Sequence, residues 1–181
     1  METITKFLSL FTISLIIFVH QTNGAGELKG KELMDQVCEQ TPHKDLCIQV
    51  LQSDPTSAFG NLQDLAMISL RVAAANASGI LSEVKIMIDD VSLDPAVQQG
   101  LSDCKENLLD AEGQLEDTVA AILTESKHDA NLWLKAALAA IDTCEASIPG
   151  NEDVLSVKSV EFRKLCNIAV AISRASLAQH A

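Results

Sequence analysis

Cysteines are the residues of this chain whose chemistry depends most on their spacing. Their positions are Cys38, Cys47, Cys104, Cys144 and Cys166. A zinc site would need closely spaced cysteine pairs with further cysteine or histidine ligands. The chain has no C-x-x-C motif, and Cys104 and Cys144 are 40 residues apart. The sequence therefore predicts no metal site.

The spacing favours a disulfide between Cys38 and Cys47, because the intervening segment EQTPHKDL can turn around Pro42. Closing so short a loop removes on the order of 3 kcal/mol of unfolded-state entropy. Cys104 and Cys144 each fall within a helical apolar stripe, where a disulfide would cross-link two facing helices. Four cysteines allow three pairings, and a fifth must stay free or pair between chains.

No other group of residues forms a convincing catalytic apparatus. The histidines beyond the start of the chain are His43, His128 and His180. A nucleophile and its base must come within hydrogen-bond reach, and nothing in the spacing of these residues suggests it. Cys166 lies on an apolar helix face in RKLCNIAVAI, which favours a buried and inert thiol. Glycine-rich phosphate-binding motifs are also absent, so we expect neither an enzyme nor a cofactor.

The first residues have the pattern of a secretory signal peptide. Lys6 precedes an apolar run at 7–19, and the small residues Gly24 and Ala25 suit cleavage. This run of about 13 residues is shorter than the roughly 20 that a spanning helix needs. We therefore predict a signal peptide at 1–24, a mature chain at 25–181 and no membrane segment after cleavage. Export to an oxidising compartment favours disulfide formation.

The charge balance narrows the class of partner. The formal net charge is −12 and aromatic residues make up only 3% of the chain. Nucleic-acid binding needs basic patches and stacking platforms, so we expect no nucleic-acid partner. An acidic surface favours a basic protein partner through electrostatic steering, although the same charge can serve solubility alone.

Four apolar stripes with steps of three and four residues predict four long helices. The two stripes that contain cysteines are Leu101, Cys104, Leu108, Ala111, Leu115, Thr118 and Ile122, and then Leu134, Ala137, Ile141, Cys144 and Ile148. The first and last stripes are Leu62, Ala66, Ser69, Val72, Ile80, Val84, Met87 and Val91, and then Leu155, Phe162, Leu165, Ala169 and Ile172.

Clear breaks separate these stripes. Ser92 or Asp94 is a candidate N-cap before Pro95, and Pro149 with Gly150 ends the third helix. Short connections make neighbouring helices antiparallel. The sequence therefore predicts an all-α fold, in which an antiparallel up-and-down four-helix bundle (57–178) follows a disulfide-stapled helical hairpin (28–53).

A glycosylation sequon lies within the first predicted helix. It reads Asn76-Ala77-Ser78, which makes Asn76 a candidate for an N-linked glycan in an exported chain. Its position in the middle of a helix, near the apolar stripe, argues against occupancy.

Several segments together resemble the plant invertase and pectin methylesterase inhibitor family. They read CEQTPHKDLCIQVLQSDP, DCKENLLDAEGQLEDTV, WLKAALAAIDTCEAS and LCNIAVAIS, and the resemblance covers essentially all of the mature chain. It implies a secreted four-helix bundle with an N-terminal hairpin, the pairs Cys38–Cys47 and Cys104–Cys144, and a free Cys166. It also implies a stoichiometric protein inhibitor rather than an enzyme.

The resemblance places the contacts of a pectin methylesterase inhibitor on its middle helices, which lie across the enzyme's cleft in a one-to-one complex. The exposed candidates in this chain are Glu106, Asp110, Glu116, Asp117 and Lys127. The C-terminal LCNIAVAIS, with its fifth cysteine, is more similar to the pectin methylesterase inhibitors.

Two alternatives stay open. Invertase inhibitors of the family use a Pro-Lys-Phe segment, and the corresponding residues here read Ser126-Lys127-His128, which keeps only the lysine. An acid invertase (β-fructofuranosidase) target would therefore depend on Lys127. The other alternative is a secreted helical bundle without an enzyme target. A signal peptide without an evident sorting tail predicts the apoplast and cell wall, with the vacuole as the other destination.

Overall fold

The computed structural model describes residues 28–150 and 155–179, and the predicted signal peptide at 1–24 lies outside them. Within these ranges the chain forms helices and no strands. The elements are α2 (Gly30–Glu39), α3 (Lys44–Gln52), the 3-10 helix η1 (Pro55–Ala58), α4 (Leu62–Ile88), α5 (Pro95–Leu123), α6 (Lys127–Ser147) and α7 (Ser156–Ala178).

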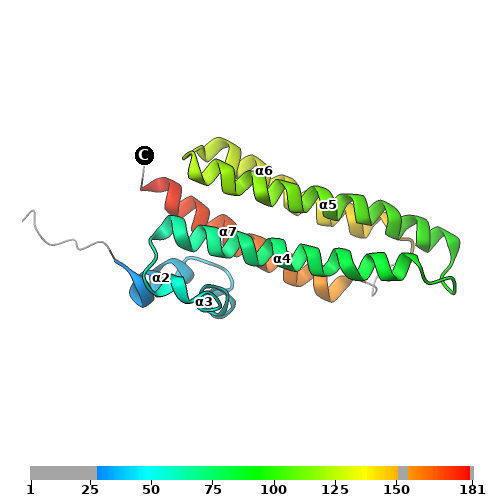
Figure 1. Cartoon of the computed structure of the whole chain (residues 1–181), viewed down its shortest axis with the longest axis horizontal. Helices are drawn as coiled ribbons and strands as arrows, with labels where there is room; N and C mark the ends of the chain where they lie inside the picture. The colour runs from blue at the N-terminus through cyan, green and yellow to red at the C-terminus, as the bar shows by residue number, and fades with distance from the viewer. Residues whose placement is uncertain (1–27, 151–154, 180–181) are drawn as a thin grey trace, which may run out of the picture.

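The four long helices form one bundle (Figure 1). Each packs against two neighbours in the cyclic order α4, α5, α6, α7. The side chain of Gln63, near the start of α4, donates a hydrogen bond to Ile122 O near the end of α5, and Gln98 at the start of α5 donates to Ile88 O at the end of α4. Each contact joins the start of one helix to the end of the other, which shows that α4 and α5 are antiparallel. The predicted all-α, up-and-down bundle is confirmed.

Local sequence signals fix where the first two bundle helices, α4 and α5, begin. Asn61 and Asp64 form a reciprocal capping box at the start of α4, with N–H to side-chain oxygen distances of 2.9 and 3.0 Å. At the start of α5, Asp94 accepts a hydrogen bond from the backbone N–H of Ala96, and Pro95 occupies the first turn. Of the two N-cap candidates in the sequence, the structure therefore uses Asp94.

The apolar stripes converge on a single core. Its largest fully buried side chains include Phe162 of α7, Leu101 and Leu108 of α5, and Leu134 of α6. One stripe extended too far: Val91 is 95% exposed, because α4 ends at Ile88 and the chain turns at Asp89 and Asp90. The stripe therefore overran the helix by three residues.

By length and composition, α4 also passes as a candidate membrane-spanning helix. Half of its most apolar window is buried inside the bundle. Core helices of water-soluble bundles have the same composition, since an apolar face must pack against its neighbours.

The hairpin of α2 and α3 packs beside α4 and α7 near one end of the bundle (Figure 1). The structure joins Cys38 to Cys47 by a disulfide with a Cα–Cα distance of 5.5 Å. Gly30 has a left-handed φ of +61°, and a Cβ there would lie 2.5 Å from Ala58 O of η1, so only glycine fits. This contact locks the hairpin onto η1 and the start of α4.

The two ends of the described chain meet at this end of the bundle. Leu28, ahead of α2, and Gln179, the C-cap of α7, line a common surface hollow. Leu33 and Val37 of α2 contribute its apolar wall.

Candidate functional site

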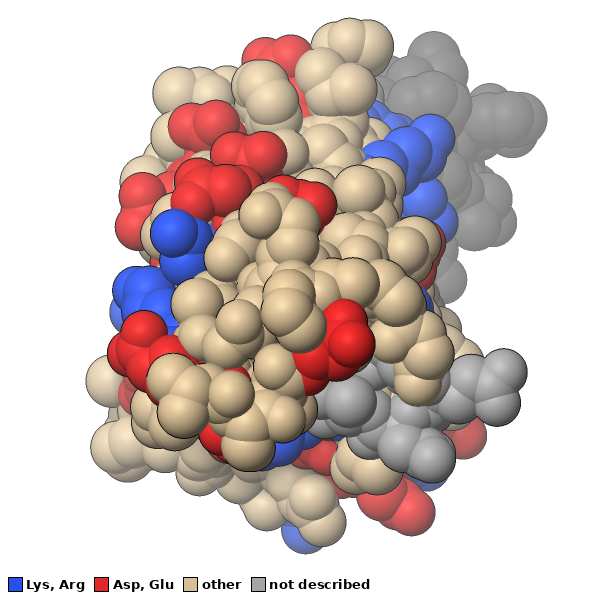
Figure 2. All heavy atoms as spheres, turned by 90° about the vertical axis from the view of Figure 1, so that its right-hand side faces the viewer, with Lys and Arg blue, Asp and Glu red and all other residues tan. Residues whose placement is uncertain are grey.

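Acidic side chains line the outer face of α5. Glu106, Asp110 and Asp117 are four and seven residues apart, so they share one helix face, and Glu116 lies beside them. All four side chains are exposed, because the core stripe of α5 occupies the opposite face. The three residues span about 16 Å along the helix at 1.5 Å per residue. In Figure 2 acidic side chains gather on the side of the molecule where α5 lies.

The charge of this face is only partly matched within the protein. Glu106 forms an ion pair with Lys105 at 2.9 Å, which at such exposure stabilises the fold very little. Asp110 and Asp117 form no ion pair with the described residues. The carboxylates of α5 are Asp103, Glu106, Asp110, Glu112, Glu116 and Asp117, and its one base is Lys105. The face therefore suits a cationic partner.

Lys127 is presented by a tightly defined turn between α5 and α6. Ser126 N–H donates to Ala121 O at 2.8 Å, and Glu125 N–H donates to Ile122 O at 3.1 Å. This pattern is a Schellman motif, in which the residue after the C-cap takes a left-handed conformation; here Glu125 has a φ of 57°. The Ser126 hydroxyl donates to Asp129 at 2.7 Å. Lys127 begins α6 and is exposed, at a different site from the middle of α5.

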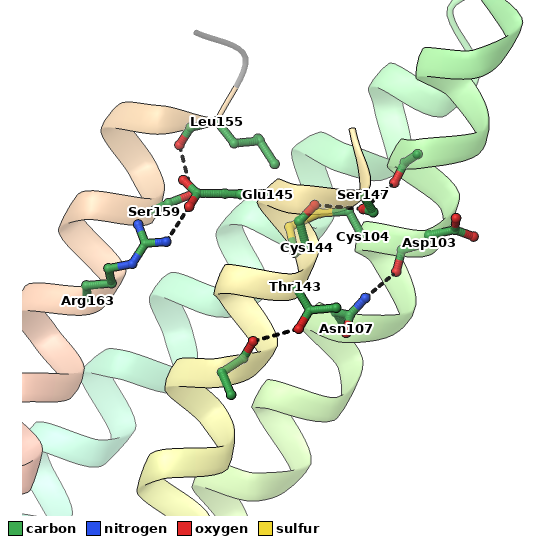
Figure 3. The surroundings of a disulfide bond; sticks show 12 residues. Asp103, Cys104, Asn107, Thr143, Cys144, Glu145, Ser147, Leu155, Ser159 and Arg163 are labelled. Atoms are coloured by element: carbon green, nitrogen blue, oxygen red, sulfur yellow. Dashed lines mark hydrogen bonds and ion pairs between the residues drawn. A yellow bond between two sulfur atoms is a disulfide. The ribbon is translucent and has the colours of Figure 1, made fainter. Parts of the chain in front are cut away.

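A disulfide fixes α6 against α5 (Figure 3). Cys104 and Cys144 are bonded, with their Cα atoms 3.9 Å apart. One turn away, the Ser147 hydroxyl donates to Gly100 O at 2.9 Å, and a Cβ at residue 100 would overlap Ser147 O. The two helix backbones therefore approach closely at this end, and the outer face of α5 rests on a rigid support.

An arginine joins α7 to α6 beside this disulfide. Arg163 donates to Asp142 at 2.7 and 3.0 Å and also pairs with Glu145, the residue after Cys144 (Figure 3). Hydrogen bonding to Glu145, and secondarily to Asp142, raises the pKa of the Arg163 guanidinium. The cation therefore stays charged and clamps the seam between α6 and α7.

The described residues bring together no catalytic or metal-binding group. No cluster of three or more His, Cys, Asp or Glu side chains among them could hold a metal ion. His43 precedes α3, His128 is exposed on α6, and His180 lies outside the described residues. Cys166 is unpaired and buried, and desolvation raises the pKa of its thiol to about 12. A thiol of this kind is unreactive at physiological pH.

Asn76 lies in the middle of α4 and is half-buried. Its Oδ1 atom is buried and has no hydrogen-bond partner among the described residues, while Ser78 of the same sequon bonds to Glu112 of α5. Glycosylation of Asn76 stays a prediction.

Sequence reasoning did not identify Phe59 as a surface feature. This side chain is 85% exposed between η1 and α4, and Leu123 at the end of α5 is 60% exposed. Both line one surface hollow. Residue type favours burial for Phe and Leu. The available signal was that Phe59 falls outside every apolar stripe, in the short segment between Pro55 and the capping residue Asn61.

The sequence of this chain is similar to those of a known protein family. A family model described as Plant invertase/pectin methylesterase inhibitor matches residues 32–172. A protein named Pectinesterase inhibitor from Actinidia deliciosa is 28% identical over 171 residues, covering 92% of this chain and 91% of that protein. A protein of Platanus acerifolia with a provisional invertase-inhibitor name is 26% identical over 172 residues, covering 92% and 94%.

A solved structure is similar in fold. The crystal structure of a mutant form of a pectin methylesterase inhibitor from Arabidopsis superimposes with a TM-score of 0.66 at 28% sequence identity, covering 78% of this chain and 95% of that one. The match includes most of the bundle that carries the acidic face of α5. This chain belongs to the plant invertase/pectin methylesterase inhibitor family, whose members are protein inhibitors and not enzymes.

Proposed function

We propose that this protein is a secreted inhibitor of pectin methylesterase that binds the enzyme one-to-one and covers its active-site cleft. The observation that carries the proposal is the exposed acidic face of α5 in a chain of this inhibitor family. Relatives named Pectinesterase inhibitor from Actinidia deliciosa and Arabidopsis thaliana support this target.

The architecture suits inhibition by surface contact. The bond between Cys104 and Cys144 holds α5 against α6, so these helices lose little conformational entropy when the enzyme binds. Unpaired carboxylates at Asp110 and Asp117 steer a cationic enzyme surface toward α5. Affinity from such charges falls as salt rises, because exposed charges are screened.

Secretion to the apoplast and cell wall is part of the proposal. Two disulfides are stable in an oxidising compartment, and the sequence predicts a signal peptide at 1–24. A relative from Arabidopsis thaliana is named Cell wall / vacuolar inhibitor of fructosidase 2, which keeps the vacuole as the alternative destination.

The test is a titration of the oxidised mature chain against a pectin methylesterase and, in parallel, an acid invertase. We expect pectin de-esterification to stop at one inhibitor per enzyme while sucrose hydrolysis continues. The triple variant Glu106→Lys, Asp110→Lys, Asp117→Lys should weaken inhibition by about tenfold or more.

A matched control separates the α5 face from overall charge. Glu32→Lys, Asp35→Lys, Asp45→Lys makes the same charge change on exposed residues of the hairpin. We expect it to leave inhibition within about twofold. Equal weakening by the two triple variants would show that net charge, and not the α5 face, carries the interaction.

Inhibition of acid invertase is the second candidate function. It is favoured by the exposure of Lys127 on the fixed turn at the start of α6, and by the invertase-inhibitor names of some relatives. Inhibition of invertase that survives Lys127→Ala would contradict a role for this residue.

A further inference from the structure

The surface hollow beside Phe59 lies at the hairpin end of the bundle. Its volume is about 430 Å³, and it is lined by residues of η1, α4 and the end of α5. The apolar side chains of the lining are Phe59, Met67, Ile68 and Leu123, and its charged side chains are Asp64 and Arg71. Phe59 is 85% exposed, and Leu123, which lines the same hollow, is 60% exposed.

The backbone of Phe59 is held on a platform of polar contacts. Asp54 accepts hydrogen bonds from Thr56 N–H at 2.9 Å and from the Thr56 hydroxyl at 2.6 Å, and it forms an ion pair with Arg71 of α4 at 2.8 Å. Phe59 N–H then donates to Thr56 O at 3.1 Å. A residue whose backbone is already ordered loses less conformational entropy on binding.

The walls of the hollow suit an apolar side chain. Met67 is half-buried and adaptable, Ile68 is buried, and Leu123 at the end of α5 is exposed. Aromatic and Met side chains around a concave spot are typical of the strongest contacts at protein interfaces.

The charged residues around the hollow indicate which kind of partner residue would lie beside an apolar side chain bound there. The hollow is continuous with α5, where Glu116 and Asp117 lie about two turns before Leu123. Asp64 adds a carboxylate to the lining. The one cation in the lining, Arg71, is matched by Asp54. The surroundings are therefore net acidic.

We propose that this hollow is a second contact zone for the target enzyme, and that it receives an apolar enzyme side chain flanked by a Lys or Arg. The proposal rests on the proposed inhibitory function. It extends the contact surface from the middle of α5 around the end of the helix to η1. Because Phe59 is exposed and its backbone is ordered, the zone contributes affinity without contributing to the stability of the free inhibitor.

The test measures the inhibition constant for pectin methylesterase with the full disulfide-bonded mature chain. Phe59→Ser should raise it by about tenfold, and Phe59→Leu should restore most of the loss. The control is Val91→Ser, which removes an apolar side chain that is 95% exposed on the α4–α5 connection, away from this hollow. Thermal unfolding of each variant checks that the fold is intact.

A charge pair tests the identity of the occupant. Leu123→Lys and Leu123→Glu both introduce a charge at the edge of the hollow, and a cationic enzyme group should make the lysine variant the weaker inhibitor by at least about fivefold at low salt. The reverse order, or no difference, would overturn the proposed chemistry of the flanking residue.

The remaining outcomes are distinct. If the wild-type chain fails to inhibit, the proposed function is wrong, and the hollow loses its assigned occupant with it. If the wild-type chain inhibits and Phe59→Ser does so equally well, only the second contact zone is wrong. A free chain that self-associates through the hollow, and whose apparent mass falls with Phe59→Ser, would assign the hollow to a second copy instead.

Discussion

The described part of this chain has two phenylalanines, and they have opposite environments. Phe162 of α7 is fully buried, whereas Phe59 before α4 is 85% exposed. Phe162 precedes Arg163, which clamps α7 to α6 beside the Cys104–Cys144 bond. Phe59 lies at the hairpin end, on a segment held by polar contacts. The difference separates two tasks: one region keeps the bundle folded, and the other offers a surface that a partner can cover.

Among the variants that separate these two regions, Phe162→Ala should lower the free energy of unfolding most. Removing a fully buried ring leaves a cavity among the helices, so the free energy of unfolding should fall by about 4 kcal/mol. Phe59→Ala should change it by about 0.5 kcal/mol or less, because an exposed ring gains little from folding. Urea unfolding measures both. Equal losses would contradict the division between the two regions.

Removing the hairpin disulfide should have the next largest effect. Cys38→Ala with Cys47→Ala lowers the free energy of unfolding by about 3 kcal/mol through the entropy of the unfolded chain. The hairpin packs on η1 through Gly30 and Ala58, so the platform of Phe59 should loosen as well. Amide hydrogen exchange should then accelerate in η1 before it does around Phe162. Uniform acceleration would show that the two ends unfold together.

Arg163→Met tests the polar contacts that join α7 to α6 near Phe162. The guanidinium bridges Asp142 and Glu145 while its side chain is 30% exposed, so the loss should be about 1 kcal/mol. Lys158→Met is the matched control, because its pair with Glu83 is more exposed and should contribute less. A larger loss in the control would show that the α4–α7 seam matters more than the α6–α7 seam.

The smallest effect concerns the platform of Phe59 at acid pH. Hydrogen bonds from Thr56, followed by the charge of Arg71, hold the pKa of Asp54 below its ordinary value of 3.8. The ionised Asp54 therefore stabilises the fold above that value, and its contribution disappears as the pH falls through the lowered pKa. The melting temperatures of wild type and Asp54→Asn should differ slightly at pH 6, and the difference should shrink as the pH falls below 3.8. A constant difference would exclude this titration.

The architecture was largely predictable from the sequence because its signals are local and repeated. Apolar residues at intervals of three and four positions predict α5, and Asp94 with Pro95 indicates where it begins. A short loop such as the Schellman turn before Lys127 makes the two helices that it connects, α5 and α6, pack antiparallel. Val91 shows the limit of this reasoning, since periodicity continues past the point where the backbone has already turned.

The interaction surface was harder to predict, because exposure alone does not distinguish a contact from a solvated side chain. Asp110 and Asp117 could be placed on an outer face, and the structure adds that no described residue neutralises them. Phe59 was not found, because the segment that carries it is held in part by the ion pair of Asp54 with Arg71, seventeen residues away. Such tertiary contacts leave no periodic trace in the sequence.

The meeting of Leu28 and Gln179 at one hollow has a topological consequence. A short linker could join positions 28 and 179 in a chain trimmed to these residues, which would suit circular permutation or backbone cyclisation. New ends could open at the exposed Pro149 and Gly150, at the end of α6. A cyclised chain would present no free ends to exopeptidases, and the join would lie across the bundle end from α5.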